Sequence, residues 1–185
     1  LLNMSDPSQF DSQSDPSDIR RDYLEAIRLI ERLHRQFLEV IKTELDNHGI
    51  ADINNIQALI LFNIGDSELT VGELTNRGYY LGSNVSYNVR KMVDNNYLIQ
   101  ERSAHDKRSV RIRPSGKGRD LYQQISDMFD RHAIAIEESS FNSAEIYTAS
   151  QSYRQLERFW TGLLNYSLMG TCLLYTSPSP RDRVL

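Results

Sequence analysis

Residues 83–117, SNVSYNVRKMVDNNYLIQERSAHDKRSVRIRPSGK, decide the fold of this chain. The pattern is typical of a short amphipathic helix, then a two-stranded hairpin with a basic tip, and then the start of another helix. Residues 77–119 hold ten Lys or Arg against three Asp or Glu, although the whole chain has a net charge of −4. Such segregated charge predicts one face that meets a polyanion, while the rest of the surface stays solvated.

The helix at the start of this stretch has one apolar and one polar face. Val85, Val89, Met92 and Val93 are expected to pack against the two preceding helices. The remaining positions are expected to face outward and to contact DNA: Ser83, Asn84, Ser86, Tyr87, Asn88, Arg90 and Lys91. Asn can pair with adenine edges and Arg with guanine edges in a major groove that admits a helix. A plain solvated face is the alternative, but the adjacent basic hairpin favours DNA.

The hairpin is expected to form two strands, residues 98–103 and 110–113, around a basic tip. Asp106 can fix the turn and orient Arg108, which can enter a narrow minor groove where the negative potential is strongest. The other basic side chains suit phosphate contacts: Arg102, Lys107, Arg111 and Arg113. A solubilising loop on an edge hairpin is the alternative interpretation.

Outside this stretch, apolar residues recur every three or four positions, which is typical of helices. One long helix is expected within residues 19–48, and two more within residues 114–165. Asn54 and Thr70 are expected to cap two shorter helices, the second of which has Glu73 in a capping box. The fold class is therefore mainly α, with a two-stranded wing.

Both ends of the chain are expected to lie outside the folded domain, which would span residues 19–165. Residues 1–18 are rich in Ser, Asp, Gln and Pro, and predict a disordered arm. Residues 166–185 depart from the helical pattern and resemble a translated sequencing-adapter read-through, with a genuine flexible tail as the alternative. Within the domain, the winged lobe that meets DNA is expected at about residues 53–113.

Several classes of protein do not fit this composition. No long apolar run and no secretory signal is visible, and Cys172 is the single cysteine, so we expect a cytoplasmic protein without membrane spans or internal disulfides. We find no phosphate-binding glycine loop, nucleophile elbow or zinc-protease motif, so no enzyme and no cofactor is expected. No metal site is expected either, because the histidines are scattered: His34, His48, His105 and His132.

Taken in order, the motifs resemble the MarR-type winged helix–turn–helix transcriptional regulators. The resemblance covers about residues 20–165 and rests on these segments: Asn54 to Gln57, Thr70-Val71-Gly72-Glu73-Leu74, Ser83-Asn84-Val85-Ser86, Asn96-Tyr97-Leu98-Ile99, Asp106-Lys107-Arg108-Ser109 and Ser115-Gly116-Lys117-Gly118. Two departures are Asn96, where the family often has Gly, and the aromatic turn Gly78-Tyr79-Tyr80-Leu81-Gly82. Asn tolerates the left-handed conformation, so we expect this turn to survive. Within the family, the chain looks most like regulators associated with cell-wall L,D-transpeptidase expression.

The resemblance implies a homodimer, with the long helices at about residues 19–48 and 114–165 forming the dimer base. A two-fold dimer would bind a pseudo-palindromic operator in double-stranded DNA, with recognition helices roughly 34 Å apart. Such a dimer would repress by excluding polymerase. The rival interpretation is a winged-helix module for protein contacts without ligand sensing, which the segregated basic charge disfavours.

The resemblance also implies release from DNA by a small-molecule effector bound between the dimer base and the DNA lobe. Sensing through a thiol is disfavoured because the expected domain has no cysteine. A small apolar or phenolic ligand remains. Its candidate contacts are apolar residues with Arg as a partner for an anion: Arg20, Tyr23, Ile27, Arg28, Phe37 and Phe62. Ordinary core packing is the alternative role for each apolar member.

Overall fold

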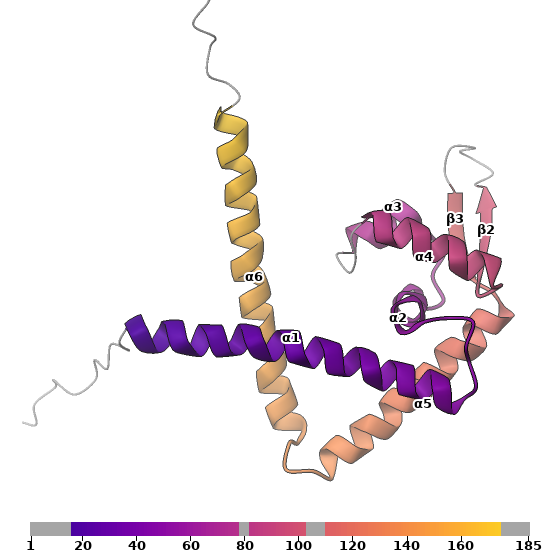
Figure 1. The fold of residues 1–185 in the computed structure, drawn as a ribbon, viewed down its shortest axis with the longest axis horizontal. Coiled ribbons are helices and arrows are strands. Elements are labelled where there is room, and N and C mark those ends of the chain that lie inside the picture. Colours follow the sequence, from indigo (N-terminus) through magenta and orange to yellow (C-terminus); the bar gives the residue numbers. More distant parts are fainter. Residues whose placement is uncertain (1–15, 78–81, 103–109, 175–185) are drawn as a thin grey trace, which may run out of the picture. The chain divides into compact units, whose positions relative to one another are not determined.

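The computed structural model describes residues 16–77, 82–102 and 110–174, including the side chains except those of residues 82, 83 and 167–174. Its elements follow the order α1 (Pro16–Asn47), α2 (Asn55–Ile64), β1 (Leu69–Thr70), α3 (Val71–Asn76), α4 (Gly82–Asp94), β2 (Leu98–Arg102), β3 (Val110–Pro114), α5 (Gly116–Glu137) and α6 (Ser143–Leu174) (Figure 1). The expected fold class, mainly α with a two-stranded wing, is confirmed. The chain divides into two units, Leu1–Met128 and Phe129–Leu185.

The two short helices begin where the sequence predicts. The Asn54 side chain accepts a hydrogen bond from the Gln57 backbone at 2.8 Å, and the Gln57 side chain accepts one from the Asn54 backbone at 3.1 Å. Thr70 and Glu73 form the same reciprocal box at the start of α3, with distances of 3.1 and 2.6 Å. Each box satisfies backbone N–H groups that a helix start otherwise leaves unpaired.

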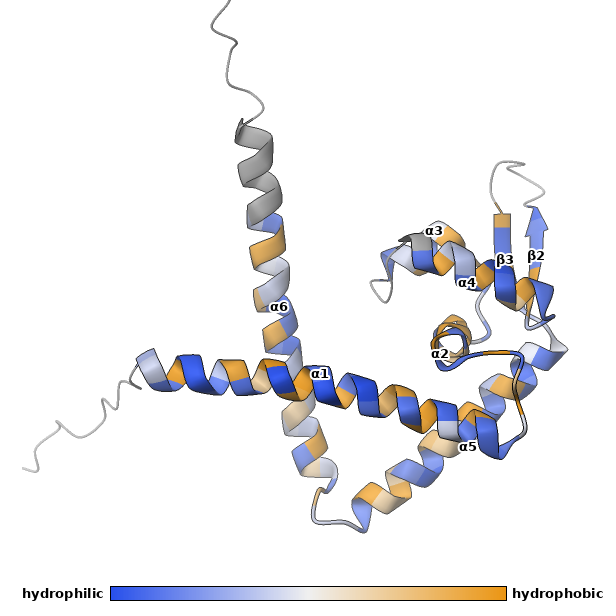
Figure 2. Ribbon diagram, in the orientation of Figure 1, coloured by the Kyte–Doolittle hydropathy of each residue, from blue (hydrophilic) through white to orange (hydrophobic). Residues whose placement is uncertain are grey.

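The core of the Leu1–Met128 unit is made where α2, α3, α4 and the sheet meet the end of α1 and the first turns of α5. Its largest fully buried side chains, each with less than 2 % exposure, are Ile41, Ile60, Leu61, Ile64, Leu74, Val85, Met92, Ile112, Ile125 and Met128. Hydrophobic and hydrophilic residues alternate along α1 in Figure 2, as expected for an amphipathic helix. No helix of the described ranges is both long and apolar enough to cross a bilayer.

The sheet has three antiparallel strands in the order β1-β3-β2. The hairpin pairs Leu98 with Pro114 at its base and Arg102 with Val110 at its far end. The third strand, β1, pairs Leu69 with Ile112 and was missed by the sequence analysis. A two-residue strand has no alternation to detect, and its pairing partner lies more than forty positions away in the chain.

Three helix boundaries differ from the sequence prediction. Helix α1 begins at Pro16 and so includes residues 16–18 of the expected arm, with proline in the first helical position, where its missing N–H is harmless. Helix α6 continues to Leu174, nine residues into the expected tail. Pro114 belongs to β3 rather than to α5, because Ser115 caps α5 by accepting a hydrogen bond from the Gly118 N–H at 3.0 Å.

The turn between α4 and β2 brings the start of α5 very close to the wing. Asn96 adopts the left-handed conformation with φ of 61°, which confirms that Asn can replace Gly here. The next residue, Tyr97, accepts a hydrogen bond through its carbonyl from the Ser115 N–H at 3.0 Å. A Cβ atom on Gly118 would lie 2.2 Å from the same carbonyl oxygen. Only glycine therefore permits this approach of two backbones.

We predict that Gly118→Ala lowers the free energy of unfolding by about 1–3 kcal/mol, because backbone must move to admit the methyl group. Gly116→Ala is the matched control, since a Cβ there meets nothing within 4 Å. Denaturant titration at one protein concentration measures both variants. Equal midpoints for the two would show that the approach is not as tight as the structure has it.

Candidate nucleic-acid interface

Helix α4 presents a polar outer face because its apolar stripe is buried. Val85, Val89 and Met92 are 0–4 % exposed, and α4 contacts α2, α3 and β2 (Figure 1). The exposed side chains on the other face are Asn84, Ser86, Tyr87, Arg90 and Lys91. Tyr87 is 59 % exposed, and the Lys91 ammonium lies 6.0 Å from its ring centroid. The Ser83 side chain lies outside the described residues.

The prediction that Asn88 lies on the outer face of α4 is wrong. Its side chain is only 9 % exposed. It donates a hydrogen bond to the Asn84 carbonyl at 2.8 Å and accepts one from the Gln57 side chain at 3.1 Å. Position 88 follows Val85 by three residues and precedes Met92 by four, so it lies on the buried stripe. Its polar chemistry was misleading, and the helical spacing was the signal that could have placed it correctly.

Two arginines predicted to contact phosphates are engaged in ion pairs on the sheet. The Arg113 guanidinium lies 2.8 Å from the Glu101 carboxylate. Arg111 lies 4.0 Å from the Glu68 carboxylate and also donates to the Glu68 carbonyl at 3.4 Å. Both arginine side chains remain about 40 % exposed, so a phosphate can reach them only in competition with a carboxylate. Arg102 is exposed at the end of β2, whereas Asp106, Lys107 and Arg108 lie outside the described residues.

A polar cluster at the base of the wing ties three segments together. The Tyr97 hydroxyl donates to one Asp52 carboxylate oxygen at 2.6 Å, and the Lys117 ammonium contacts the other. Lys117 also donates to the Asn95 carbonyl at 3.1 Å and lies 4.2 Å from the Tyr97 ring centroid. The cluster fixes where the hairpin leaves the lobe, because Asp52 precedes α2, Tyr97 precedes β2 and Lys117 opens α5.

The cluster also shifts two pKa values in opposite directions. The hydrogen bond from Lys117, followed by that from Tyr97, lowers the pKa of Asp52. Burial, together with the neighbouring Asp52 carboxylate, raises the pKa of Tyr97 well above its usual range. At neutral pH the cluster is therefore a charged carboxylate held by one ammonium and one neutral phenol.

We predict that Asp52→Asn destabilises the protein at neutral pH and that this difference fades in acid. A carboxyl group with a lowered folded-state pKa stabilises the fold above its usual pKa of about 3.9, and this stabilisation is lost as the pH falls through the folded-state value. Thermal unfolding from pH 7 to pH 3 measures the difference. Asp66→Asn, which removes another carboxylate from the same lobe, controls for net charge. A pH-independent difference would contradict the assignment.

The candidate effector contacts are spread over two helices. Five lie on α1, where Phe37 follows Arg20 by seventeen positions, or about 26 Å of helix, so one small ligand can contact only a subset of them. Arg28 lies 3.9 Å from the Glu25 carboxylate. The sixth, Phe62 on α2, stacks on Tyr122 with ring centroids 5.0 Å apart. Core packing therefore already occupies one face of the Phe62 ring.

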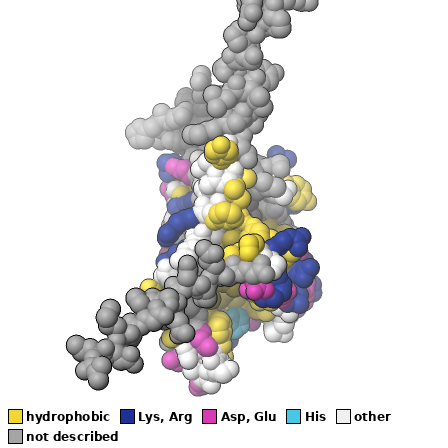
Figure 3. Space-filling model, turned by 90° about the vertical axis from the view of Figure 1, so that its left-hand side faces the viewer, with side chains coloured by type: hydrophobic (Ala, Val, Ile, Leu, Met, Phe, Trp, Pro, Cys, Tyr) yellow, Lys and Arg dark blue, Asp and Glu magenta, His cyan; other side chains and the backbone are white. Residues whose placement is uncertain are grey.

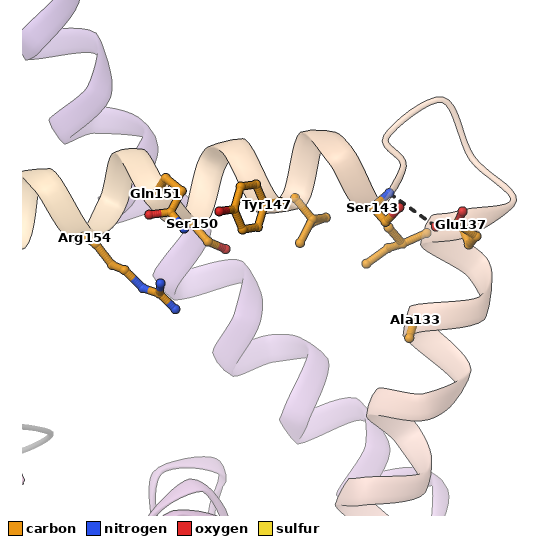
Figure 4. Close-up of a pocket in the computed structure, with 9 residues that line it drawn as sticks. Ala133, Glu137, Ser143, Tyr147, Ser150, Gln151 and Arg154 are labelled. Atoms are coloured by element: carbon orange, nitrogen blue, oxygen red, sulfur yellow. Dashed lines mark hydrogen bonds between the residues drawn. The ribbon is translucent and has the colours of Figure 1, made fainter.

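A pocket of about 440 Å³ lies instead within the Phe129–Leu185 unit, between the end of α5 and the start of α6. It is lined by Ala133, Ile136, Glu137, Ser143, Ile146, Tyr147, Ser150, Gln151 and Arg154, none of which was predicted (Figure 4). Glu137 accepts a hydrogen bond from the Ser143 backbone at 3.3 Å across the turn between the two helices. Nowhere in the described ranges do three or more His, Cys, Asp or Glu side chains gather so as to hold a metal ion.

Comparison with known proteins places these features in a family. The sequence model of the MarR family matches residues 51–109. The chain is 36 % identical over 154 residues to the exopolysaccharide II synthesis transcriptional activator ExpG of Rhizobium meliloti (strain 1021), covering 83 % of this chain and 79 % of that protein.

Two solved structures share the fold at low sequence identity. Streptococcus pneumoniae FabT in complex with DNA has a TM-score of 0.62 at 17 % identity, covering 76 % of this chain and 99 % of FabT. Staphylococcus aureus MarR in complex with salicylate and kanamycin has a TM-score of 0.62 at 17 % identity, covering 79 % of this chain and 97 % of that one. Fold, motif order and sequence identity agree: the chain belongs to the MarR family of winged-helix transcriptional regulators.

Proposed function

We propose that the chain is a homodimeric regulator that binds double-stranded DNA in a sequence-specific manner. The observation that carries the proposal is the polar outer face of α4, which stands exposed beside a basic hairpin in a fold shared with FabT in its complex with DNA. A helix of this size fits the major groove, and the hairpin extends toward an adjacent groove. The rival, a module for protein contacts alone, predicts no preference for any duplex.

The outer residues of α4 divide by chemistry into base readers and phosphate contacts. Arg90 suits the paired acceptors of guanine, and Asn84 suits the acceptor and donor of adenine. Ser83, Ser86, Tyr87 and Lys91 suit phosphate oxygens. In the wing, we propose that Arg108 enters the minor groove with Asp106 orienting it, and that Arg102, Lys107, Arg111 and Arg113 contact phosphates. Asn88 has no place in this set, because it is buried.

We predict that Arg90→Ala weakens binding to the preferred duplex by about 1–3 kcal/mol and weakens binding to a scrambled duplex much less, because a base contact carries specificity. Arg35→Ala is the control, since it removes an equal charge from an exposed position on α1. The preferred duplex is recovered by selection from random DNA and titrated at fixed salt. Equal losses on both duplexes would show that Arg90 contacts phosphate.

Exposed apolar side chains supply a surface for a dimer. On α1, four large apolar residues are 40–59 % exposed: Ile19, Leu29, Leu33 and Val40. On α6, six are 50–81 % exposed: Tyr147, Tyr153, Phe159, Leu163, Leu164 and Tyr166. Hydrophobic side chains also stand uncovered on the face drawn in Figure 3. Apolar surface of this extent is typical of an interface, and a second copy of the chain covers it in the proposed dimer.

We predict that Phe159→Glu converts the dimer to a monomer and abolishes specific DNA binding, because an unpaired charge would enter the interface. Thr161→Glu introduces the same charge on the opposite side of α6, where the Thr161 hydroxyl bonds only its own helix at the Glu157 carbonyl. Light scattering after size exclusion reports the mass. A wild-type mass of one chain would remove the dimer from the proposal.

The sign of regulation has two candidates. We propose repression, as the sequence resemblance implies: a dimer bound over a promoter would exclude polymerase. Activation is the second, because ExpG, the relative of Rhizobium meliloti, is named as a transcriptional activator. A reporter gene distinguishes repression from activation when the selected duplex is placed either upstream of its promoter or across it. Regulation of L,D-transpeptidase genes stays a prediction.

We propose that a small apolar or phenolic effector weakens DNA binding. The support is the shared fold with Staphylococcus aureus MarR, solved with salicylate, and the apolar candidates on α1 and α2. An effector shifts the equilibrium only by its difference in affinity for the two states, so release from DNA needs several kcal/mol of difference.

We predict that salicylate lowers the affinity for the preferred duplex and that Phe37→Ala reduces this effect more than Arg154→Ala does. Phe37 belongs to the candidate contacts on α1, whereas Arg154 lines the separate pocket on α6. Fluorescence anisotropy with and without salicylate measures both. If Arg154→Ala reduces the salicylate effect more than Phe37→Ala does, the effector site lies in the α5–α6 pocket. If salicylate does not change the DNA affinity of the wild type, this phenolic acid is not a ligand.

A further inference from the structure

A buried hydrogen bond joins the start of α2 to the middle of α4. Gln57, the third residue of α2, donates from its amide nitrogen to the Asn88 side-chain oxygen at 3.1 Å. The two side chains are 6 % and 9 % exposed, and they are the buried polar side chains of the part of the chain that the structure describes. The same two helices, which contact each other, also carry fully buried apolar residues: Ala58 and Ile60 on α2, and Val85 on α4.

Both amides are fixed in orientation by further hydrogen bonds. The Gln57 side-chain oxygen accepts from the Asn54 backbone at 3.1 Å, so its nitrogen is the end that points at Asn88. The Asn88 nitrogen donates to the Asn84 carbonyl at 2.8 Å, so its oxygen is the end that points at Gln57. Each donor thus meets an acceptor, and rotating either amide by 180° would set like groups against each other.

A directional bond constrains α4 in a way that apolar packing does not. Hydrophobic contact varies little with a small slide or rotation of a helix, whereas a buried hydrogen bond is lost within a short displacement and leaves polar groups unsatisfied. A rotation of α4 by about 20° would move the atoms on its outer surface by about 2 Å, given a helix radius of about 5–6 Å. A displacement of that size breaks a hydrogen bond to a base edge.

We infer that Gln57 is a positioning residue for DNA sequence recognition, which it supports through Asn88 by setting the rotation of α4 in the lobe. Gln57 is buried and cannot contact DNA itself. Asn84 and Arg90 lie on the same helix as Asn88, so the rotation of α4 decides where these proposed base readers stand in the groove. The inference rests on the proposed function and adds a residue of α2 to those that determine its DNA sequence specificity.

The test separates the bridge from the cap of α2, because Gln57 takes part in both. Gln57→Glu keeps an acceptor for the Asn54 N–H, and Glu suits this capping position, but it sets an oxygen against the Asn88 oxygen. Asn54→Ala is the matched control, since it removes the hydrogen bond that the Asn54 side chain accepts in the cap and leaves the Gln57–Asn88 bond in place. A double variant, Gln57→Met with Asn88→Leu, replaces the bridge by an apolar contact of similar size. It also removes the Gln57 half of the cap, and the Asn54→Ala control shows what weakening this cap does by itself.

The readout is the ratio of affinities for the preferred and the scrambled duplex, measured with the full chain at fixed salt. We expect Gln57→Glu and the double variant to lower this ratio by about tenfold or more, through weaker binding to the preferred duplex, as for one lost base contact. Affinity for the scrambled duplex should stay unchanged, because phosphate contacts remain. Asn54→Ala should lower the thermal midpoint and leave the ratio unchanged.

The outcomes distinguish the inference from the function on which it rests. If the wild-type chain prefers no duplex, the proposed function fails, and the inference with it. If the wild type has a preference that the folded double variant retains in full, the inference alone is overturned. A ratio that falls equally with Asn54→Ala would also overturn it, because the effect would then follow the stability of α2 and not the bridge.

Discussion

Burial of the apolar stripe of α4 determines which side chains of this helix stand outside the lobe. Val85 and Met92 are almost completely buried, and each such side chain contributes about 1.5–3 kcal/mol when it leaves water. The Asn88–Gln57 hydrogen bond contributes less, since a typical one adds about 0.5–1.5 kcal/mol net. The stripe therefore supplies most of the stability of the contact, and the hydrogen bond adds direction. Every functional assignment on the outer face follows from this packing.

The wing is held to the same lobe by polar contacts at its base. Gly118 lets the α5 backbone reach the Tyr97 carbonyl, and Asp52 and Lys117 close the cluster around the Tyr97 side chain. These contacts join the segment before α2, the start of the hairpin and the start of α5. In the proposed complex, the spacing between the recognition helix and the wing is a property of the lobe itself, and DNA does not have to impose it.

Much of the fold could be predicted because its signals are local. The capping residues Asn54 and Thr70 act on backbone groups within three positions, so the starts of α2 and α3 follow from short motifs. Strand β1 could not be predicted, because its pairing with β3 depends on residues far away in the chain. The extension of α6 to Leu174 runs through residues whose composition is not typical of the preceding helix.

The candidate site could likewise be predicted only in part. The exposure of Asn84 and Arg90 followed from helical periodicity, whereas Asn88 was misplaced because its chemistry was given more weight than its position, and its partner Gln57 lies 31 residues away. The ion pairs of Arg111 and Arg113 depend on strand register and on Glu68 beyond the hairpin, which sequence patterns do not specify.

Those ion pairs have a consequence for how the protein would search a chromosome. An arginine that already neutralises a carboxylate brings less net charge to DNA, so fewer counterions are displaced for each contact than the number of arginines suggests. Non-specific DNA binding, which is almost wholly electrostatic, is therefore weakened more than binding through contacts to base edges. Such a regulator would dissociate quickly from non-specific DNA and would stay bound longer at its preferred sequence.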